Sequence, residues 1–400
     1  MTEPVGTYPF KSPTAVEPPP EWAWLRQRCP VAPVRLPSGD EAVLLTRYDS
    51  VRRMMADPRF TRELSAEDAA RISTAPEGGP FAAPSALEMT GEGHRQWRRL
   101  VIKWFTVRRM AALRARIEDR ADTLIDAMHQ RGAPVDLVRA LAFPLPVWVI
   151  CELLGVPDSD RDRFAHWAHV QLSISEFTSA DIAAAQDEFD AYMSAHLAAK
   201  RAAPGDDLLS ELIAVRDSGD GRLSEEALIA TGQGLLVAGH ETTSNMISKM
   251  VLMLLADRRH WEELLADFGL VDGAVEEALR YDLASGFGLP RYLTEDVDVE
   301  GAALPRGTTV VCGLGAANRD ERVFDHAERV DLRRSPNPHL AFGAGPHACL
   351  GQALARTELR AVLGVLLRRL PTLDLAAPAA SVATRDEILS GGIRELLVRW

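Results

Sequence analysis

The feature that most limits the fold is a run of about 30 residues, from 224 to 257, which contains no proline and has the pattern of one helix. Ser224 is a suitable N-cap, and Glu225 and Glu226 follow in the first turn, where the helix dipole favours acidic side chains. Such a helix is about 45 Å long, which is enough to cross a whole domain. The 400 residues are 46% hydrophobic and contain no linker-like tract, so we expect one large domain around this helix.

The rest of the pattern predicts a mainly α protein with small β-sheets. Amphipathic helical segments fill residues 117–220, with breaks at 132–134, 155–157 and 204–205. Strand-like runs are confined to a hairpin around the turn at 37–40 and to residues 290–315. Residues 1–20 are rich in proline and are expected to form an extended N-terminal arm, and residues 21–400 to form the single domain.

Composition excludes several classes of function. A net charge of −12 makes nucleic acid an unsuitable partner. The four cysteines show no C-x-x-C or other paired spacing, which argues against a zinc site or a disulfide framework. The first residues contain no apolar run fit for a signal peptide or a membrane anchor, so we expect a soluble, cytoplasmic protein without a membrane partner.

The stretch HLAFGAGPHACLGQALA places Cys349 between a glycine-rich loop and a segment with helical periodicity. A sulfur at a helix N-terminus faces unpaired N–H groups and the positive end of the dipole, and both favour the thiolate. Three interpretations compete: a buried structural cysteine, a dinucleotide-binding loop and an axial ligand of iron. The dinucleotide pattern G-x-G-x-x-A needs a preceding strand, whereas the approach to this loop contains Pro336 and Pro338.

A polar group, Gly239 to Thr243, interrupts the apolar middle of the long predicted helix. His240 and Glu241 match the start of the zinc motif H-E-x-x-H, but Ser244 stands where the second histidine is required. The alternative to a functional role is that these are buried polar groups hydrogen-bonded to the backbone. Gly239 weakens the helix by about 1 kcal/mol and a threonine can bond back to a carbonyl, so we expect the helix to open a groove here.

Three motifs, which follow one another along the chain in the family's order, resemble those of the cytochrome P450 family, in its soluble bacterial type. Phe342, Gly345, His347, Cys349 and Gly351 form F-x-x-G-x-H-x-C-x-G, which is similar to the family's haem-binding signature. Ala238 to Thr243 form A-G-x-E-T-T, which is similar to its oxygen-activation motif, and Glu277 and Arg280 form E-x-x-R. Family-like residues run from about residue 90 to 360, but Gly93 stands where the family commonly has an acid.

The resemblance implies the family's fold, haem b as cofactor and the thiolate of Cys349 as the ligand of its iron. It implies that Glu241 and Thr242 are catalytic, with Thr242 holding bound oxygen and Glu241 helping to deliver protons. The residues that it assigns to haem binding are His94, Arg98, Arg291, Phe342, His347, Cys349 and Gly351, of which His94, Arg98, Arg291 and His347 bind the propionates. Glu277 and Arg280 would form a buried structural ion pair that Arg334 joins. Taken alone, an acid and a base three apart would be an ordinary pair on a helix surface. Leu87, Met89, Leu235, Ala238, Phe287 and Leu289 would line the substrate pocket.

The activity implied by the resemblance is insertion of one oxygen atom from O2 into a C–H or C=C bond of a mid-sized apolar substrate in secondary metabolism. Electrons would pass from NAD(P)H through a ferredoxin reductase and a ferredoxin. A basic run without acids, from residue 94 to 116, fits such an acidic partner, or is an ordinary solvated helix face. Two alternatives remain open: oxidative coupling or ring closure at the same haem, and a haem-thiolate sensor without catalysis.

Overall fold

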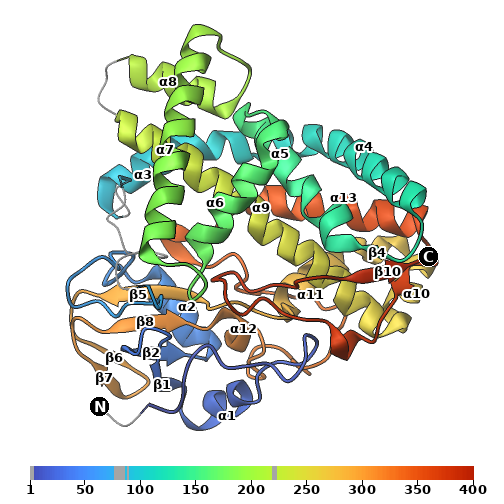
Figure 1. Ribbon diagram of the computed structural model, residues 1–400. Coiled ribbons are helices and arrows are strands. Elements are labelled where there is room, and N and C mark those ends of the chain that lie inside the picture. The colour runs from blue at the N-terminus through green and yellow to red at the C-terminus, as the bar shows by residue number, and fades with distance from the viewer. Residues whose placement is uncertain (1–3, 76–85, 88–89, 219–222) are drawn as a thin grey trace.

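The computed structural model describes residues 4–75, 86–87, 90–218 and 223–400. Helices occupy most of the molecule, and the strands gather mainly on one side of it, near the N-terminus (Figure 1). The predicted fold class, mainly α with small β-sheets, is confirmed. The longer helices are α3 Gly91–Val101, α4 Val107–Arg131, α5 Pro144–Leu154, α6 Arg161–Leu172, α7 Ser179–Ala202, α8 Leu208–Asp217, α9 Glu225–Ala256, α11 Val271–Tyr281 and α13 Gln352–Arg369; the shorter are α1 Glu21–Arg28, α2 Tyr48–Ala56, α10 Arg258–Ala266 and α12 Leu314–Ala317.

The predicted long helix is α9, and it crosses the middle of the helical part (Figure 1). The Ser224 side chain accepts a hydrogen bond from the backbone N–H of Ala227, as an N-cap does. Helices α5, α6, α7, α8, α10, α11 and α13 all pack against α9. Most of its side chains are therefore buried.

The strands form three small sheets. The largest has the order β1-β2-β8-β5-β3, and the others are β4-β10-β9 and β6-β7. Their bounds are β1 Val31–Arg35, β2 Glu41–Leu45, β3 Phe60–Thr61, β4 Val135–Asp136, β5 Leu289–Leu293, β6 Val297–Val299, β7 Ala302–Leu304, β8 Thr309–Cys312, β9 Asp374–Leu375 and β10 Leu397–Arg399. The predicted hairpin is β1-β2, with Arg35 opposite Glu41, and β2 then pairs in parallel with β8.

The first described residues of the predicted N-terminal arm, 5–8, lie along the edge of the large sheet, whereas Ala15 and Val16 pack against the helical part. The backbone N–H groups of Val5 and Tyr8 donate to the carbonyl oxygens of Pro33 and Arg35, each at 2.8 Å. The Tyr8 hydroxyl donates to the carbonyl oxygen of Phe287 at 2.6 Å. The arm thus adds to the sheet and contacts a segment far along the chain.

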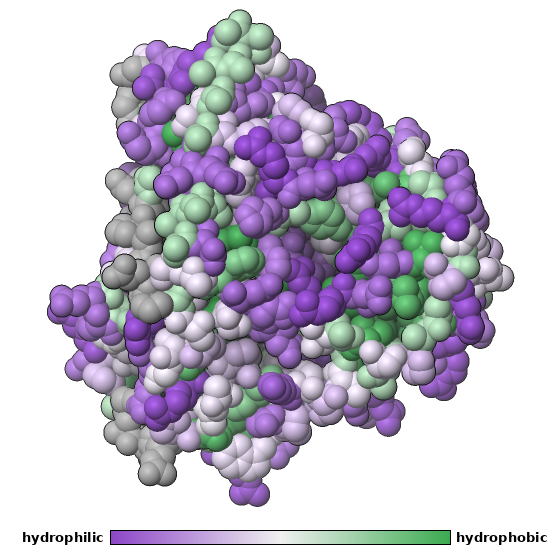
Figure 2. Space-filling view, viewed as in Figure 1, coloured by the Kyte–Doolittle hydropathy of each residue, from purple (hydrophilic) through white to green (hydrophobic). Residues whose placement is uncertain are grey.

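Hydrophobic packing joins the helices into one large core. The core residues of α4, α5, α7, α9, α11 and α13 form a single cluster, and two smaller clusters lie on the sheet side. The face drawn in Figure 2 carries polar side chains over most of its area, with hydrophobic ones in smaller groups. No helix in the described part of the chain is long and apolar enough to span a bilayer.

Candidate functional site

The Cys349 loop is shaped by glycines and packs closely on α2. Gly343 and Gly345 have φ angles of +68° and +72°, which other residues rarely adopt. A Cβ at Gly345 would lie 2.7 Å from the Cα of Ala56, so only glycine permits this approach. The loop is closed by the N–H of Cys349, which donates to the carbonyl oxygen of Phe342 at 2.7 Å. The Phe342 ring in turn lies 4.4 Å below the Arg356 guanidinium.

The sulfur of Cys349 lies just before α13, as predicted. Burial raises the pKa of the thiol, whereas the Gly351 N–H and the charges of Arg98 and Arg356 lower it. Protein atoms surround the residue, yet part of its surface stays open. A metal cation at the sulfur would deprotonate it outright, since a coordinated thiol is bound as the thiolate.

Arginine and histidine side chains from three distant segments converge beside this loop. His94 and Arg98 share one face of α3, and Arg98 Nη2 donates to the carbonyl oxygen of Ala348 at 2.7 Å. The rings of His94 and His347 lie 4.4 Å apart. Burial, followed by the nearby charges of His94, Arg62, Arg291 and Arg98, lowers the pKa of His347 to about 3. The sequence-predicted group of His94, Arg98, Arg291 and His347 is thus brought together.

Arg62 is a member of this group that sequence reasoning missed. It follows β3, whose antiparallel pairing with β5 places Thr61 opposite Tyr292 and so brings Arg62 near Arg291. Burial, with the charge of Arg291, lowers the pKa of Arg62 to about 10. Nothing in the local sequence signals this role, because it depends on strand pairing across more than two hundred residues.

The chemistry of this group fits a ligand with two carboxylates. In the described part of the molecule, no acidic side chain pairs with Arg62, Arg98 or Arg291. Nε of Arg291 and Nδ1 of His347 are buried and lack a hydrogen-bond partner among the described residues. A buried guanidinium N–H without an acceptor is unfavourable, so Arg291 calls for an anionic ligand, and the neutral ring of His347 can donate to the same ligand. With the open sulfur of Cys349, the residues present fit a haem with its two propionates.

The middle of α9 exposes one face. Ala238 and Thr242 are exposed and Leu235 is partly exposed, although α9 is otherwise largely buried. The Thr242 hydroxyl donates to the carbonyl oxygen of Ala238 at 2.8 Å, which is the expected back-bond. Helix α9 runs through Gly239 without a break, so the groove stays a prediction. Gly239 serves packing, since a Cβ there would lie 2.7 Å from Cδ1 of Ile150 on α5.

Glu241 is turned away from that face and held by the C-terminal segment. Its side chain is buried, and its Oε1 accepts a hydrogen bond from Arg385 Nη1 at 2.8 Å. Asn245, one turn later, donates to the same oxygen at 3.4 Å and to the carbonyl oxygen of Gly391 at 2.9 Å. Arg385 and Asn245 were not predicted, since their place depends on how the C-terminal segment returns to α9.

Glu277 and Arg280 form a fully buried, bidentate ion pair on α11. Arg280 Nη2 and Nε each lie 2.8 Å from an oxygen of Glu277, and Arg334 Nε lies 3.1 Å from Glu277 Oε2. Arg280 also donates to the carbonyl oxygens of Asn318, Ala327 and Arg329. The predicted trio thus meets, and it joins α11 to the segment leading to the Cys349 loop.

The residues predicted for the substrate pocket divide into groups. Leu235 and Ala238 lie on the open face of α9, and Leu289 lies beside the Cys349 loop, where a Cβ on Gly343 would be 3.8 Å from its Cδ1. Leu87 is partly buried, and Met89 lies outside the described residues. Phe287 was predicted to line the pocket, and the structure corrects this assignment. Its side chain is 1% exposed and packs edge-on against Tyr8, with ring centroids 5.1 Å apart. It therefore belongs to the core between the sheet and the N-terminal arm.

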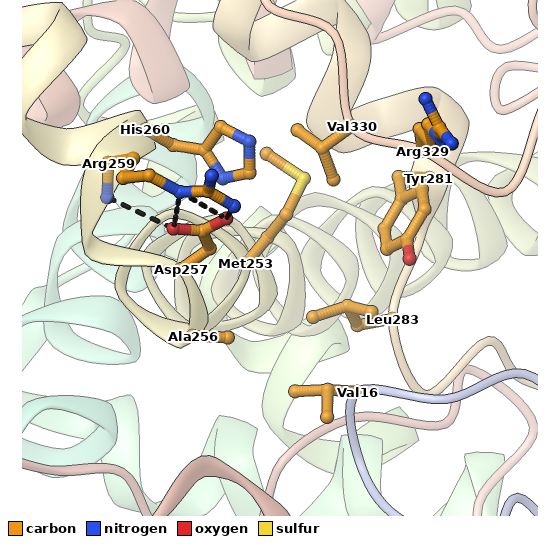
Figure 3. A pocket seen from close by; sticks show the side chains of 10 residues that line it. All are labelled: Val16, Met253, Ala256, Asp257, Arg259, His260, Tyr281, Leu283, Arg329 and Val330. Atoms are coloured by element: carbon orange, nitrogen blue, oxygen red, sulfur yellow. Dashed lines mark hydrogen bonds and ion pairs between the residues drawn. The ribbon is translucent and has the colours of Figure 1, made fainter. Parts of the chain in front are cut away.

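A separate hollow of about 480 Å³ lies where α9 ends (Figure 3). Met253 and Leu283 are on its apolar wall, and Arg259 and Asp257 stand at its edge as a bonded pair, with Nε 2.9 Å from Oδ1. Its lining includes none of the motif residues. The hollow is distinct from the candidate site.

Comparison with known proteins identifies the family that this chain resembles. The family model described as cytochrome P450 matches residues 172–374. Nocardicin C N-oxygenase of Nocardia uniformis is 42% identical, and the match covers 98% of both chains. Mycinamicin IV hydroxylase/epoxidase of Micromonospora griseorubida is also 42% identical, again over 98% of both chains.

Solved structures agree over the whole chain. The putative thioether synthase SgvP, involved in tailoring griseoviridin, has a TM-score of 0.93 at 38% identity, and the match covers 100% of both chains. The LnmA cytochrome P450 hydroxylase from the leinamycin pathway of Streptomyces atroolivaceus has a TM-score of 0.88 at 42% identity, covering 99% of this chain and 100% of that one.

Proposed function

We propose that this chain, which belongs to the cytochrome P450 family, oxygenates a mid-sized apolar metabolite in a pocket between the open face of α9 and the Cys349 loop. The protein is a haem-thiolate monooxygenase, and its cofactor is haem b. When bound, the haem supplies an iron centre that activates O2 with two electrons, so that one oxygen atom enters the substrate and the other leaves as water.

The observation that carries the haem site is the convergence of arginine guanidinium groups and two neutral histidine rings beside the accessible sulfur of Cys349. We assign Cys349 to the iron and His94, Arg98, Arg291 and His347 to the propionates. Arg62 joins them because its guanidinium is close enough to lower the pKa of both histidines. Phe342 and Gly351 flank the sulfur. The Gly351 N–H donates a hydrogen bond to the Cys349 sulfur, which reduces the negative charge on the sulfur and thus the electron density that it would donate to the metal.

Proton supply to the pocket is assigned to Thr242 and Glu241. The Thr242 hydroxyl lies on the open face and can turn from the carbonyl oxygen of Ala238 to hold a proton for the reacting oxygen. Glu241 is next in sequence but is bonded to Arg385, so its carboxylate must leave that guanidinium before it can serve the pocket. Arg385 is thereby a positioning residue for Glu241.

The substrate class rests on the lining and on the relatives. Leu235, Ala238 and Leu289 offer apolar contacts with no charged group among them. Relatives about 40% identical carry names that refer to nocardicin C and mycinamicin IV. We therefore propose a secondary metabolite as substrate.

The electron donor is proposed to be a ferredoxin, reduced in the cytoplasm by NAD(P)H through its reductase. Lys103 and Arg108 are exposed near the junction of α3 and α4 and have no acidic partner among the described residues. Val107 is 79% exposed between them. Exposed cations around an apolar residue suit an acidic protein surface, and Arg98 connects this region to the loop that carries Cys349.

Two measurements test the proposal. The reduced, carbon monoxide-bound protein should absorb at the long wavelength typical of thiolate-bound haem, and Cys349→His should shift that band to the position of imidazole-bound haem. Incubation with ferredoxin, its reductase, NAD(P)H and 18O2 should add one labelled oxygen atom to a bound metabolite. A spectrum of the imidazole type from the unaltered protein would refute the iron ligand.

A second candidate is oxidative bond formation at the same haem, without oxygen insertion. The structural similarity to the putative thioether synthase SgvP favours it. Product mass separates the two, because bond formation removes two hydrogen atoms and adds no oxygen.

A further inference from the structure

Three side chains able to coordinate a metal ion meet where α6, the 173–178 loop and the C-terminal segment come together. One ligand atom each of His169, Glu176 and Glu387 lies within 4.8 Å of the others. His169 Nε2 and Glu176 Oε2 are 2.8 Å apart. We propose that this cluster is a binding site for a divalent transition-metal ion, with Zn²⁺ as the best match, and that the ion cross-links the 173–178 loop to the C-terminal segment.

The donor set selects the class of metal. Zinc accepts imidazole nitrogen and carboxylate oxygen at about 2.0 to 2.2 Å, usually with four ligands in a tetrahedron. Ligand atoms around such an ion are about 3.4 Å apart, so separations of at most 4.8 Å need to change by no more than about 1.4 Å. Calcium and magnesium prefer sites made of oxygen alone, and the imidazole argues against them. Water would complete the coordination, because the protein offers three ligands.

The surroundings support the site and limit its strength. The His169 ring packs edge-on against Phe177, with centroids 5.3 Å apart, which restricts its orientation. Arg394 Nη2 donates to Glu387 Oε1 at 2.7 Å, and Arg385 Nε lies 3.9 Å from the same oxygen, so Glu387 Oε2 stays available. These arginines hold the carboxylate but repel a cation, so we expect micromolar binding. The Glu176 side chain is 44% exposed, which gives the ion access from solvent.

The backbone already joins the same two segments. The Ile174 N–H donates to the carbonyl oxygen of Glu387 at 2.9 Å, and the Leu389 N–H to that of Leu172 at 2.8 Å. In Figure 1 the junction of α6 and α7 lies close to the red C-terminal segment. An ion would add a side-chain cross-link to this short backbone pairing. That the cross-link restrains access to a substrate pocket rests on the proposed function; the metal site itself does not.

Titration of the haem-loaded, tag-free protein with ZnCl₂ in a calorimeter tests the site. We expect one saturable site, and His169→Ala should weaken it tenfold or more. His166→Ala is the matched control, since it removes an exposed histidine from the same helix outside the cluster and should leave the affinity unchanged. No saturable binding, or equal losses in the two variants, would overturn the proposal.

Hydrogen exchange tests the cross-link separately. Zinc should slow exchange at the amides of Ile174 and Leu389 in the unaltered protein and in His166→Ala, but not in His169→Ala. Unchanged exchange at saturating zinc would contradict the cross-link. Neither measurement needs turnover, so a negative result here leaves the monooxygenase assignment untouched, and failure of that assignment would leave these results valid.

Discussion

At the scale of single residues, Thr242 and Glu241 are neighbours that face different surroundings. The Thr242 hydroxyl is on the open face of α9, while the Glu241 carboxylate is buried against Arg385. In the proposed proton delivery, Thr242 is already at the pocket, whereas Glu241 must first be released from Arg385. The two are expected to respond differently to substitution.

Thr242→Ala should keep its haem but divert reducing equivalents into hydrogen peroxide, because the hydroxyl that holds the proton is gone. We expect the peroxide formed per NAD(P)H to rise several-fold, measured with a peroxidase-coupled assay. Thr242→Ser retains the hydroxyl and should restore coupling. Thr243→Ala changes a buried neighbour and serves as the control. Peroxide yields that do not differ among the three variants would remove Thr242 from the mechanism.

Glu358 is a buried acid whose charge should limit stability at high pH. It lies on α13, fully buried, and both its carboxylate oxygens lack a hydrogen-bond partner among the described residues. Burial raises the pKa of Glu358 well above its ordinary value. As pH rises through the ordinary pKa, the unfolded chain releases this proton and the folded protein keeps it, so the folded state loses stability. The loss is about 1.4 kcal/mol per pH unit until the raised pKa is reached.

Glu358→Gln removes this titration, so the variant should gain stability over the unaltered protein as the pH rises. Melting temperatures of both proteins between about pH 6 and pH 8 check this, and the gap should widen toward pH 8. Glu395→Gln, at an exposed position, should show no such trend. Parallel pH profiles for Glu358→Gln and the unaltered protein would mean that Glu358 is stabilised by some group outside the described contacts.

The residues that could be predicted are those with a local signature. Cys349 follows a glycine loop, His94 and Arg98 are four apart on a helix, and Glu277 and Arg280 are three apart. Arg62 and Arg385 could not be predicted, since distant segments bring them to the site. Phe287 was misassigned for the same reason, because the N-terminal arm that covers it is remote in sequence.

At the scale of elements, α11 depends on a glycine at its contact with the segment that carries Arg334. A Cβ on Gly273 would clash with the backbone carbonyl oxygen of Leu332, which cannot rotate away as a side chain could. Gly273→Ala should therefore push α11 away from this segment and disturb the bonds between Glu277 and Arg334. Overpacking of this kind destabilises by about 1 to 3 kcal/mol.

Urea unfolding and the haem-to-protein ratio measure the effect of Gly273→Ala, and both stability and haem content should fall. Gly234→Ala on α9 is the matched control, because its Cβ would meet no atom within 4 Å. That variant should be as stable as the unaltered protein, or more stable by up to about 1 kcal/mol from helix propensity. Equal behaviour of the two variants would contradict the packing argument.

Elements with a strong local pattern were predicted and those with remote pairing were not. The whole of α9 was predicted from its N-cap and the absence of proline, and the β1-β2 hairpin from its turn. The parallel pairing of β2 with β8 joins Val43 to Val310, and nothing near either residue indicates it. Gly239 shows the limit of propensity, since tertiary packing on Ile150 keeps the helix intact there.

At the scale of the whole molecule, charge is distributed unevenly. The net charge is −12, yet the ends of α3 and α4 that meet near Cys349 carry an exposed basic surface, with Arg95, Arg99, Lys103, Arg108 and Arg109. Arg99 is bonded to Glu92 and Arg109 stacks on Trp104 at 3.7 Å, so both have structural partners. Arg108 has no such ion pair or stacking partner among the described residues, so reversing its charge tests the interaction with a partner protein without disturbing the fold.

Arg108→Glu should weaken the ferredoxin-supported reduction of the haem several-fold at low ionic strength, because a like charge then opposes an acidic partner. The difference should shrink at high salt, where the Debye length is only a few ångströms. Arg131→Glu is the matched control: it reverses an exposed arginine on the same helix, about 35 Å away, and should leave reduction unchanged. Stopped-flow reduction at two salt concentrations makes the comparison. Equal rates for the two variants at low salt would place the docking surface elsewhere, whereas a deficit confined to Arg108→Glu would locate the electron donor beside the loop that carries Cys349.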